Sequence, residues 1–138
     1  MVVLVVLVAS CAHTVPSIAA HVSCEALCVQ LPTGGAEVDV YWPDGAEPAP
    51  MVIVAHGFSR GRHNMSGWGQ HLAGEGIVAV VPDLPTWSDH VRNGRFLSEL
   101  RAHLLGDESF RKRIDAARVG LMGFSAGGLS SLLSAAGS

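Results

Sequence analysis

The sequence has 138 residues, of which 49% are hydrophobic and 15% are charged, a composition typical of a single globular domain. Nine lysine and arginine residues against twelve aspartate and glutamate residues give a formal net charge of −3. Proteins that bind nucleic acid usually carry a basic surface, so this charge argues against a nucleic-acid partner. The three cysteines form no C-x-x-C pair, and no P-loop or dinucleotide-binding glycine motif occurs. We therefore expect no cofactor and no metal ion.

The first twenty residues are predicted to be a signal peptide. Val2–Val8 is an unbroken apolar run followed by small residues, and the first charged residue of the chain is Glu25. An apolar run that ends in small residues is typical of an export signal, although the usual basic start is absent. The run is too short to span a membrane. Residues 22–138 are then the folded part of an exported protein.

Two ways of processing this leader stay open. Cys11 follows Val8-Ala9-Ser10, which resembles a bacterial lipoprotein signal in which the cysteine becomes the lipidated first residue. Cleavage after Ala20 would instead release a soluble secreted protein. In the first case a lipid anchor on Cys11 would attach the protein to a membrane of the cell envelope.

Residues 22–42 are predicted to form an antiparallel hairpin whose turn contains Pro32, Gly34 and Gly35. Cys24 and Cys28 fall on the first strand of this hairpin. Four residues along a strand span about 13 Å, which is too far for a disulfide bond. We therefore predict that these two cysteines are unpaired and buried as small apolar residues.

After a proline-rich loop, the chain is predicted to alternate between strands and helices. Three apolar runs have the length of strands buried on both faces: 51–55, 77–81 and 119–122. Three segments have the composition or the apolar spacing of helices: 64–73, 90–105 and 126–136. A hairpin followed by this alternation predicts a three-layer α/β/α sandwich with a mostly parallel sheet.

The strongest chemical signal is the motif G-x-S-x-G at Gly123-Phe124-Ser125-Ala126-Gly127. It directly follows a predicted buried strand and opens a predicted helix, which is the context that a nucleophile elbow requires. Ser125 would sit in a strained turn, and Gly123 and Gly127 would let the strand and the helix pass closely. A glycine-rich turn that only packs is the alternative interpretation.

A second signal follows the first buried run. The backbone N–H groups of Phe58, in His56-Gly57-Phe58, and of Ala126 could converge on one carbonyl oxygen and form an oxyanion hole. We predict that His56 supports the loop structurally, together with Gly57, and is not the catalytic base. Asp83 is predicted to anchor a loop.

Residues 51–138 resemble the α/β-hydrolase superfamily. Within it, they are most similar to dienelactone-hydrolase-like esterases, chlorophyllases, platelet-activating-factor acetylhydrolases and bacterial polyester hydrolases. The resemblance rests on four stretches: 52–58, 72–78, 81–83 and 113–128. It implies a serine hydrolase that cleaves a lipid, small acyl or polyester ester through an acyl-enzyme on Ser125. The amides of Phe58 and Ala126 would then form the oxyanion hole.

The sequence departs from the superfamily after the motif. The acid and the histidine of the catalytic triad follow the serine in chain order. None of the thirteen residues after Ser125 is Asp, Glu or His. We therefore expect a domain truncated after the helix of the elbow and inactive by itself. A serine acyltransferase or peptidase of the same fold, and a non-catalytic domain anchored at the surface, remain alternatives.

Overall fold

The computed structural model describes residues 2–3, 21–45 and 47–137, so Cys11 and Ala20 lie outside the described residues. One mixed sheet has the strand order β1-β6-β4-β5-β3-β2. Its strands are β1 (Val2–Val3), β2 (Ser23–Leu31), β3 (Gly34–Trp42), β4 (Ala49–Ala55), β5 (Val78–Pro82) and β6 (Ile114–Gly123). The helices are η1 (Arg62–Met65), α1 (Ser66–Gly74), α2 (His90–Gly106), α3 (Glu108–Arg113) and α4 (Ala126–Ala136).

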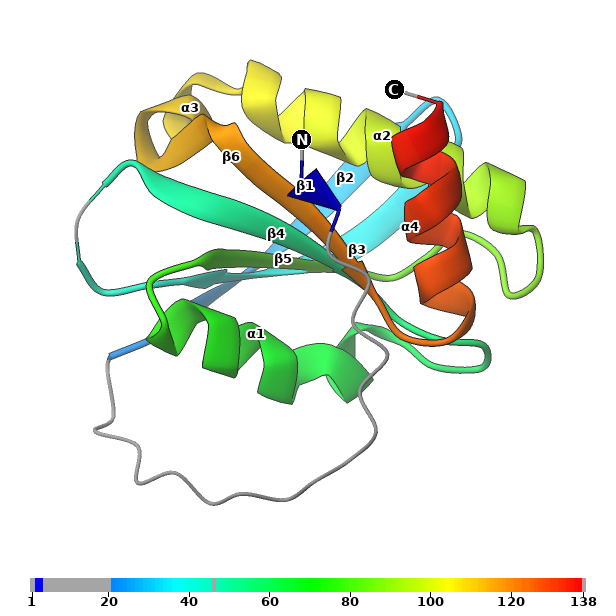
Figure 1. Cartoon of the computed structure of the whole chain (residues 1–138), viewed down its shortest axis with the longest axis horizontal. Helices are drawn as coiled ribbons and strands as arrows, with labels where there is room; N and C mark the ends of the chain where they lie inside the picture. The colour runs from blue at the N-terminus through cyan, green and yellow to red at the C-terminus, as the bar shows by residue number, and fades with distance from the viewer. Residues whose placement is uncertain (1, 4–20, 46, 138) are drawn as a thin grey trace.

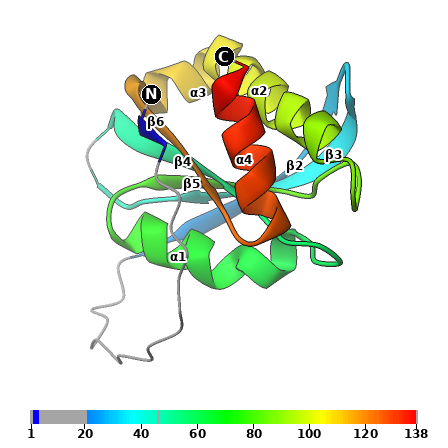
Figure 2. The same cartoon turned by 45° about the vertical axis from the view of Figure 1, so that its right-hand side comes forward.

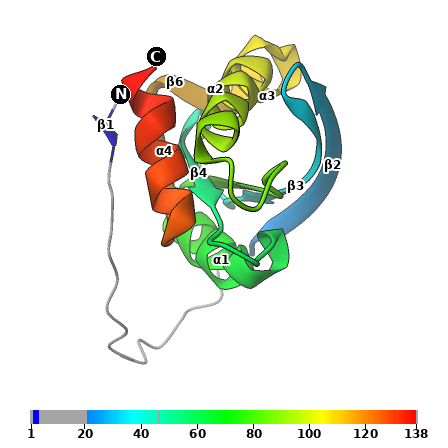
Figure 3. The same cartoon turned by 90° about the vertical axis from the view of Figure 1, so that its right-hand side faces the viewer.

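The helices cover both faces of the sheet. Helix α1 lies on one face, and α2, α3 and α4 lie on the other (Figure 1). The two turned views keep this separation, with α2 and α4 side by side (Figures 2 and 3). The predicted three-layer α/β/α sandwich is therefore confirmed.

The strand pairing follows the predicted plan. β2 and β3 form an antiparallel hairpin, and β3 is also antiparallel to β5. β5, β4 and β6 are parallel to one another, which places their C-terminal ends at the same edge of the sheet. The turn that enters α4 and the loop that follows β4 therefore meet at this edge (Figure 1).

Alternating residues of the strands fill two separate cores. On the side of α2, Val40 and Ile53 pack with Phe96, Leu97 and Leu100 of that helix. On the side of α1, Tyr41, Val54 and Ala79 pack with Met65 and Ala73, among others. Neighbouring residues of one strand belong to different cores because successive side chains point to opposite faces.

Two glycines weaken α1 as an isolated helix, and the structure explains one of them. A Cβ atom on Gly69 would lie 2.4 Å from a ring carbon of Tyr41 on β3. Real side chains do not approach so closely, so Gly69 lets the helix pack directly onto the aromatic ring. Close packing against the sheet thus compensates for the poor helix propensity of this segment.

The region before the motif differs from the prediction. Strand β6 begins at Ile114, five residues before the predicted start at 119, and α3 precedes it without having been predicted. Asp107 caps α3 by accepting hydrogen bonds from the backbone N–H groups of Ser109 and Phe110. Arg113, the last residue of α3, stacks on the ring of Trp42 at 3.7 Å.

The prediction for the hairpin cysteines is wrong in one respect. Cys24 and Cys28 are unpaired, as expected, but both are exposed instead of buried. Strand β2 forms the edge of the sheet and pairs only with β3 in the described part of the chain. Val29 of the same strand is buried in the core on the side of α2, and Leu27 and Leu31 pack against that core. Cys24 and Cys28 lie on the opposite face of the strand, because successive side chains point to opposite faces.

Two residues of the predicted leader take part in the sheet. Val2 and Val3 form β1, which runs parallel to β6 opposite Gly120 and Leu121. Removal of a signal peptide would remove this short strand from the edge of β6. Among the helices that the structure describes, none is both long and apolar enough to cross a membrane.

Candidate active site

The motif around Ser125 forms a tight turn between β6 and α4. Ser125 has φ of 53° and ψ of −119°, a backbone conformation that a residue with a side chain rarely adopts. The residue is exposed at the end of the sheet, directly before the first residue of α4. The strand, strained turn and helix that the G-x-S-x-G motif requires are therefore all present.

The glycines that flank Ser125 are required by close backbone approaches. A Cβ atom on Gly123 would lie 2.3 Å from the carbonyl carbon of Gly127. A Cβ atom on Gly127 would lie 2.3 Å from the carbonyl oxygen of Ala55, at the end of β4. These approaches leave no space for a side chain, so both glycines allow the turn to fold against β4.

The loop after β4 lies directly against the Ser125 turn. A Cβ atom on Gly57 would lie 3.2 Å from the carbonyl oxygen of Phe124 and 3.5 Å from Cβ of Ser125. The backbone N–H of Phe124 also donates to the carbonyl oxygen of Ala55 at 3.1 Å. The structure thus brings His56-Gly57-Phe58 and Ser125 together, as the sequence predicted.

His56 is buried and uses both ring nitrogens. Nε2 accepts a hydrogen bond from the backbone N–H of Leu84 at 2.9 Å, and Nδ1 lies 2.9 Å from the carbonyl oxygen of Gly57. Because an amide N–H can only donate, the ring proton is on Nδ1 and Nδ1 donates to Gly57. His56 therefore ties the loop after β4 to the loop after β5, and neither nitrogen is left to act as a base.

This hydrogen bond also orients the next peptide group. The carbonyl oxygen of Gly57 accepts from His56 Nδ1 and from the backbone N–H of Arg60, the latter at 3.2 Å. In a trans peptide the C=O and N–H bonds point in opposite directions, so the N–H of Phe58 points away from His56. No hydrogen bond among the described residues uses the N–H of Phe58 or of Ala126. Both groups are free to donate to a bound oxygen.

Arg62 holds the far end of the same loop, a role that sequence reasoning missed. Its guanidinium contacts three carboxylates: Asp83 at 2.5 Å, Glu37 at 2.5 Å and Asp39 at 3.1 Å. Its backbone N–H donates to Asp83 Oδ1 at 2.7 Å. Burial opposes the charge of Arg62, but the hydrogen bonds and charges of Asp83 and Asp39 outweigh it, so the pKa of Arg62 is raised.

Asp83 and Leu84 are consecutive residues, and each holds one end of the loop that carries Phe58. Asp83 binds Arg62, and Leu84 binds His56. The prediction that Asp83 anchors a loop is confirmed. No local pattern in the sequence indicated Arg62, because its partners lie 21 to 25 residues away along the chain.

Arg62→Ala is expected to lower the free energy of unfolding by about 2 kcal/mol, because three carboxylates would lose a charged partner that is only 14% exposed. Urea denaturation of the variant beside the wild type measures the difference. Arg60→Ala is the matched control, since Arg60 is exposed in the same loop. Equal losses in the two variants would contradict a specific role for Arg62.

A shallow depression beside this turn is lined by Phe58, Ala126, Leu84 and Trp87, among others. Phe58 and Trp87 are 59% and 71% exposed, which is unusual for large apolar side chains. Trp87 lies on the loop between β5 and α2, and no motif in the sequence indicated that it would lie beside Phe58.

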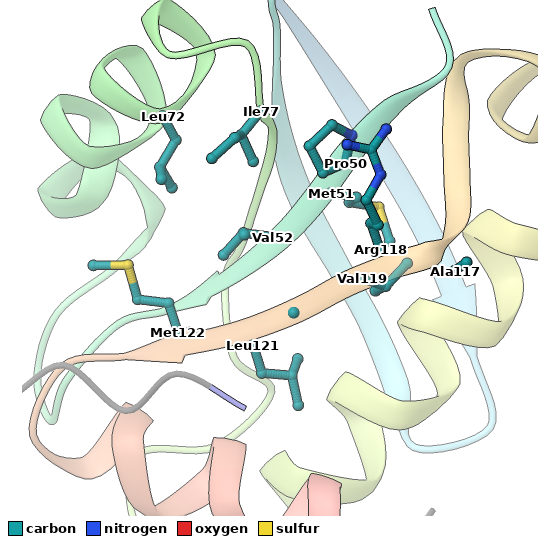
Figure 4. Close-up of a pocket in the computed structure, with 11 residues that line it drawn as sticks. Pro50, Met51, Val52, Leu72, Ile77, Ala117, Arg118, Val119, Leu121 and Met122 are labelled. Carbon is teal, nitrogen blue, oxygen red and sulfur yellow. The ribbon is translucent and has the colours of Figure 1, made fainter. Parts of the chain in front are cut away.

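A larger apolar hollow lies elsewhere. It has a volume of about 340 Å³ and lies between α1 and strands β4 and β6. Val52, Leu72 and Met122 face it from these three elements (Figure 4). Neither Ser125 nor the two candidate oxyanion donors line it, so it is separate from the candidate active site. Within the described ranges, no group of three or more His, Cys, Asp or Glu side chains could hold a metal ion.

Solved structures of the same architecture define the class of this fold. Dienelactone hydrolase from Anabaena variabilis superposes with a TM-score of 0.72 at 21% identity, over 84% of this chain and 58% of that chain. 2,6-Dihydroxy-pseudo-oxynicotine hydrolase superposes with a TM-score of 0.71 at 21% identity, over 83% of this chain and 34% of that chain. The chain therefore has an α/β-hydrolase fold of the dienelactone hydrolase type.

The family follows from the sequence comparison. The model of the PET hydrolase-like family (PETase) matches residues 11–138, and the chain belongs to this family. Bis(hydroxyethyl) terephthalate hydrolase from Streptomyces coelicolor is 33% identical over 99 residues, which are 70% of this chain and 32% of that protein. The chain thus spans about a third of the length of this curated relative.

Proposed function

We propose that this chain belongs to a serine hydrolase that cleaves carboxylic esters. The observation that carries the proposal is the pair of unused N–H groups, of Phe58 and Ala126, beside the exposed Ser125. Two amide donors close to a nucleophilic oxygen can stabilise the negative charge of a tetrahedral intermediate. The PET hydrolase-like family and the terephthalate ester hydrolase among the relatives support an ester as the substrate.

The reaction would proceed in two steps. Ser125 Oγ attacks the ester carbonyl carbon while its proton passes to a general base, and the carbonyl oxygen becomes an oxyanion bound by the two amides. The bond to the alcohol oxygen then breaks, the alcohol takes up a proton, and an acyl-Ser125 ester remains. Water attacks this ester, which releases the carboxylic acid and restores the serine.

The proposal requires a base from outside the described residues. No hydrogen bond in the described part of the chain joins Ser125 Oγ to a histidine or a carboxylate, and both nitrogens of His56 are already bound. A serine hydroxyl without a base is a weak nucleophile at neutral pH. We therefore propose that residues 1–138 alone are inactive, so activity is to be measured on the protein from its complete reading frame.

A fluorophosphonate probe tests the proposal, because it reacts with activated serines and stays bound. Peptide mapping of the labelled protein is expected to place the adduct on Ser125. Labelling of a different serine, or no labelling of a protein that hydrolyses p-nitrophenyl acetate, would contradict the proposal. Ser88→Ala is a suitable control, since Ser88 is exposed on the loop after β5 and should not affect labelling.

We also propose that the protein is exported and that Cys11 is lipidated. The support is the apolar run Val2–Val8 followed by small residues and Cys11. Mass spectrometry of the native N-terminus is expected to find a cysteine that carries a diacylglyceryl group, and Cys11→Ser should release the protein from the membrane fraction. A mature N-terminus at His21 would establish ordinary secretion instead.

A further inference from the structure

Strand β2 has an open outer edge. It is the last strand in the order of the sheet and lies on the side of the molecule away from α4 (Figure 3). It is nine residues long, and an edge strand of this length can pair with a strand of another chain. Charged side chains often protect such edges, but the only charged residue of β2 is Glu25, and its carboxylate accepts from Nε1 of Trp42 at 3.1 Å.

The backbone groups at this open edge can be assigned from the pairing of β3. The carbonyl oxygen of Glu37 on β3 accepts from the backbone N–H of Asp83 at 2.9 Å and therefore points away from β2. Glu37 lies opposite Cys28, so these two residues are a non-hydrogen-bonded pair of the hairpin. Cys28 then turns its own N–H and C=O groups outward. Ala26 and Cys24 do the same, because the pattern repeats every second residue.

The side chains of these three residues share one face of the strand. Cys24, Ala26 and Cys28 alternate with Glu25 and Leu27, so they point to the same side of the sheet. All three are exposed, and neither cysteine forms a disulfide bond. The two thiols lie at equal distances along the strand on either side of Ala26.

We propose that two copies of this chain pair through β2 and that disulfide bonds join Cys24 of each copy to Cys28 of the other. The strands would be antiparallel, with Ala26 on the two-fold axis, which places each cysteine opposite its counterpart. Opposite residues that exchange hydrogen bonds have Cα atoms about 5.5 Å apart. Disulfide bonds join residues with Cα atoms about 4.4–6.8 Å apart, so the register fits. Glu25 would lie opposite Leu27, and no like charges would meet.

The reaction needs an oxidant, which can be a small disulfide such as oxidised glutathione. One cysteine thiolate attacks a glutathione sulfur, forms a mixed disulfide and releases one glutathione thiolate. The opposite cysteine thiolate attacks the protein sulfur of this mixed disulfide and releases the second glutathione. For each bond, two electrons and two protons pass from the protein thiols to two molecules of reduced glutathione. Ser125 takes no part, so the inference does not depend on the proposed function.

Single-cysteine variants of the protein from its complete reading frame test the register. In Cys24→Ser, the remaining Cys28 would lie four residues, or about 13 Å, from Cys28 of the second copy, and the same holds for Cys24 in Cys28→Ser. With oxidised glutathione, neither variant alone should give a dimer on a non-reducing gel. An equimolar mixture places Cys28 of one variant opposite Cys24 of the other and should give at least about tenfold more dimer.

Two controls accompany this mixture. The double variant Cys24→Ser with Cys28→Ser keeps Cys11 and measures cross-linking through other thiols. Ala26→Pro removes the N–H at the two-fold axis, at a position where an edge strand tolerates proline, and should reduce the dimer to this background. Ala26→Val keeps the N–H and should form as much dimer as wild type.

Three results would overturn the inference. The first is a wild-type protein that forms no more dimer than the double variant. The second is equal cross-linking by the mixture and by each single variant alone, which would exclude a fixed register. The third is a folded Ala26→Pro protein, as judged by circular dichroism, that cross-links as well as wild type.

Discussion

Replacement of Ser125 by alanine is expected to lower kcat/KM for ester hydrolysis by at least about a thousandfold, because alanine has no side-chain oxygen to which the acyl group can be transferred. The measurement is the release of p-nitrophenolate from p-nitrophenyl acetate by the protein from its complete reading frame. Alanine removes one oxygen atom from an exposed side chain, so the fold should be unchanged.

Ser88→Ala provides the matched control for this loss. It removes the same atom from another exposed serine and should leave turnover within about twofold of wild type, as expected for a surface substitution. Equal thermal unfolding temperatures for the two variants would exclude a folding defect. Turnover by Ser125→Ala close to the wild-type rate would rule out Ser125 as the nucleophile.

The second large effect is expected at Phe58, through its backbone. Phe58→Pro deletes the N–H and should lower kcat by about 10²–10³, the usual effect of losing one oxyanion donor. Phe58→Leu keeps the N–H and should retain most of the activity toward p-nitrophenyl acetate, which has no acyl ring for Phe58 to contact. The contrast between the two variants assigns the effect to the backbone.

Proline also constrains the loop, so its effect on folding is measured in parallel. The far-UV circular dichroism and the thermal unfolding of Phe58→Pro are compared with those of Phe58→Leu. Hydrogen bonds from His56 and Arg62 hold the two ends of this loop, and they do not involve the N–H of Phe58. A folded Phe58→Pro enzyme with normal kcat would refute the proposed role of the amide.

The arrangement of layers could be predicted from the sequence because it depends on local patterns. Apolar runs such as 51–55 and 77–81 are long enough for strands but too short for helices, and their order along the chain determines a three-layer sandwich. The Ser125 turn was predictable for the same reason, since the glycine spacing and the flanking strand and helix are contiguous in the chain.

The features that were missed depend on contacts between distant parts of the chain. Helix α3 carries a basic run that resembles a solvated surface, but Arg113 packs on Trp42, 71 residues earlier in the sequence. Arg62 is one arginine among several until the fold brings Asp83 and Glu37 beside it. Cys24 is exposed although Val29, on the other face of β2, is buried, and the alternation of side chains cannot indicate which face of this edge strand is covered.

Most residues of the candidate site could be predicted from the sequence, but their spatial arrangement could not. The sequence indicated Ser125 and the loop of Phe58, and their contact through Gly57 depends on the parallel pairing of β4 with β6. The tautomer of His56 could be assigned only after Leu84 was found to donate to Nε2. Trp87 lies beside Phe58 only because of the fold, since 29 residues separate the two along the chain.

Trapping of the acyl-enzyme is the most direct test of Ser125 as the residue that accepts the acyl group. The full-length protein is mixed with p-nitrophenyl benzoate, quenched in acid within milliseconds and digested for mass spectrometry. The peptide that contains Ser125 is expected to carry one benzoyl group, which disappears as turnover is completed and is absent in Ser125→Ala. Steady hydrolysis of the ester with no acylated peptide, or with the benzoyl group on another residue, would contradict the proposed mechanism.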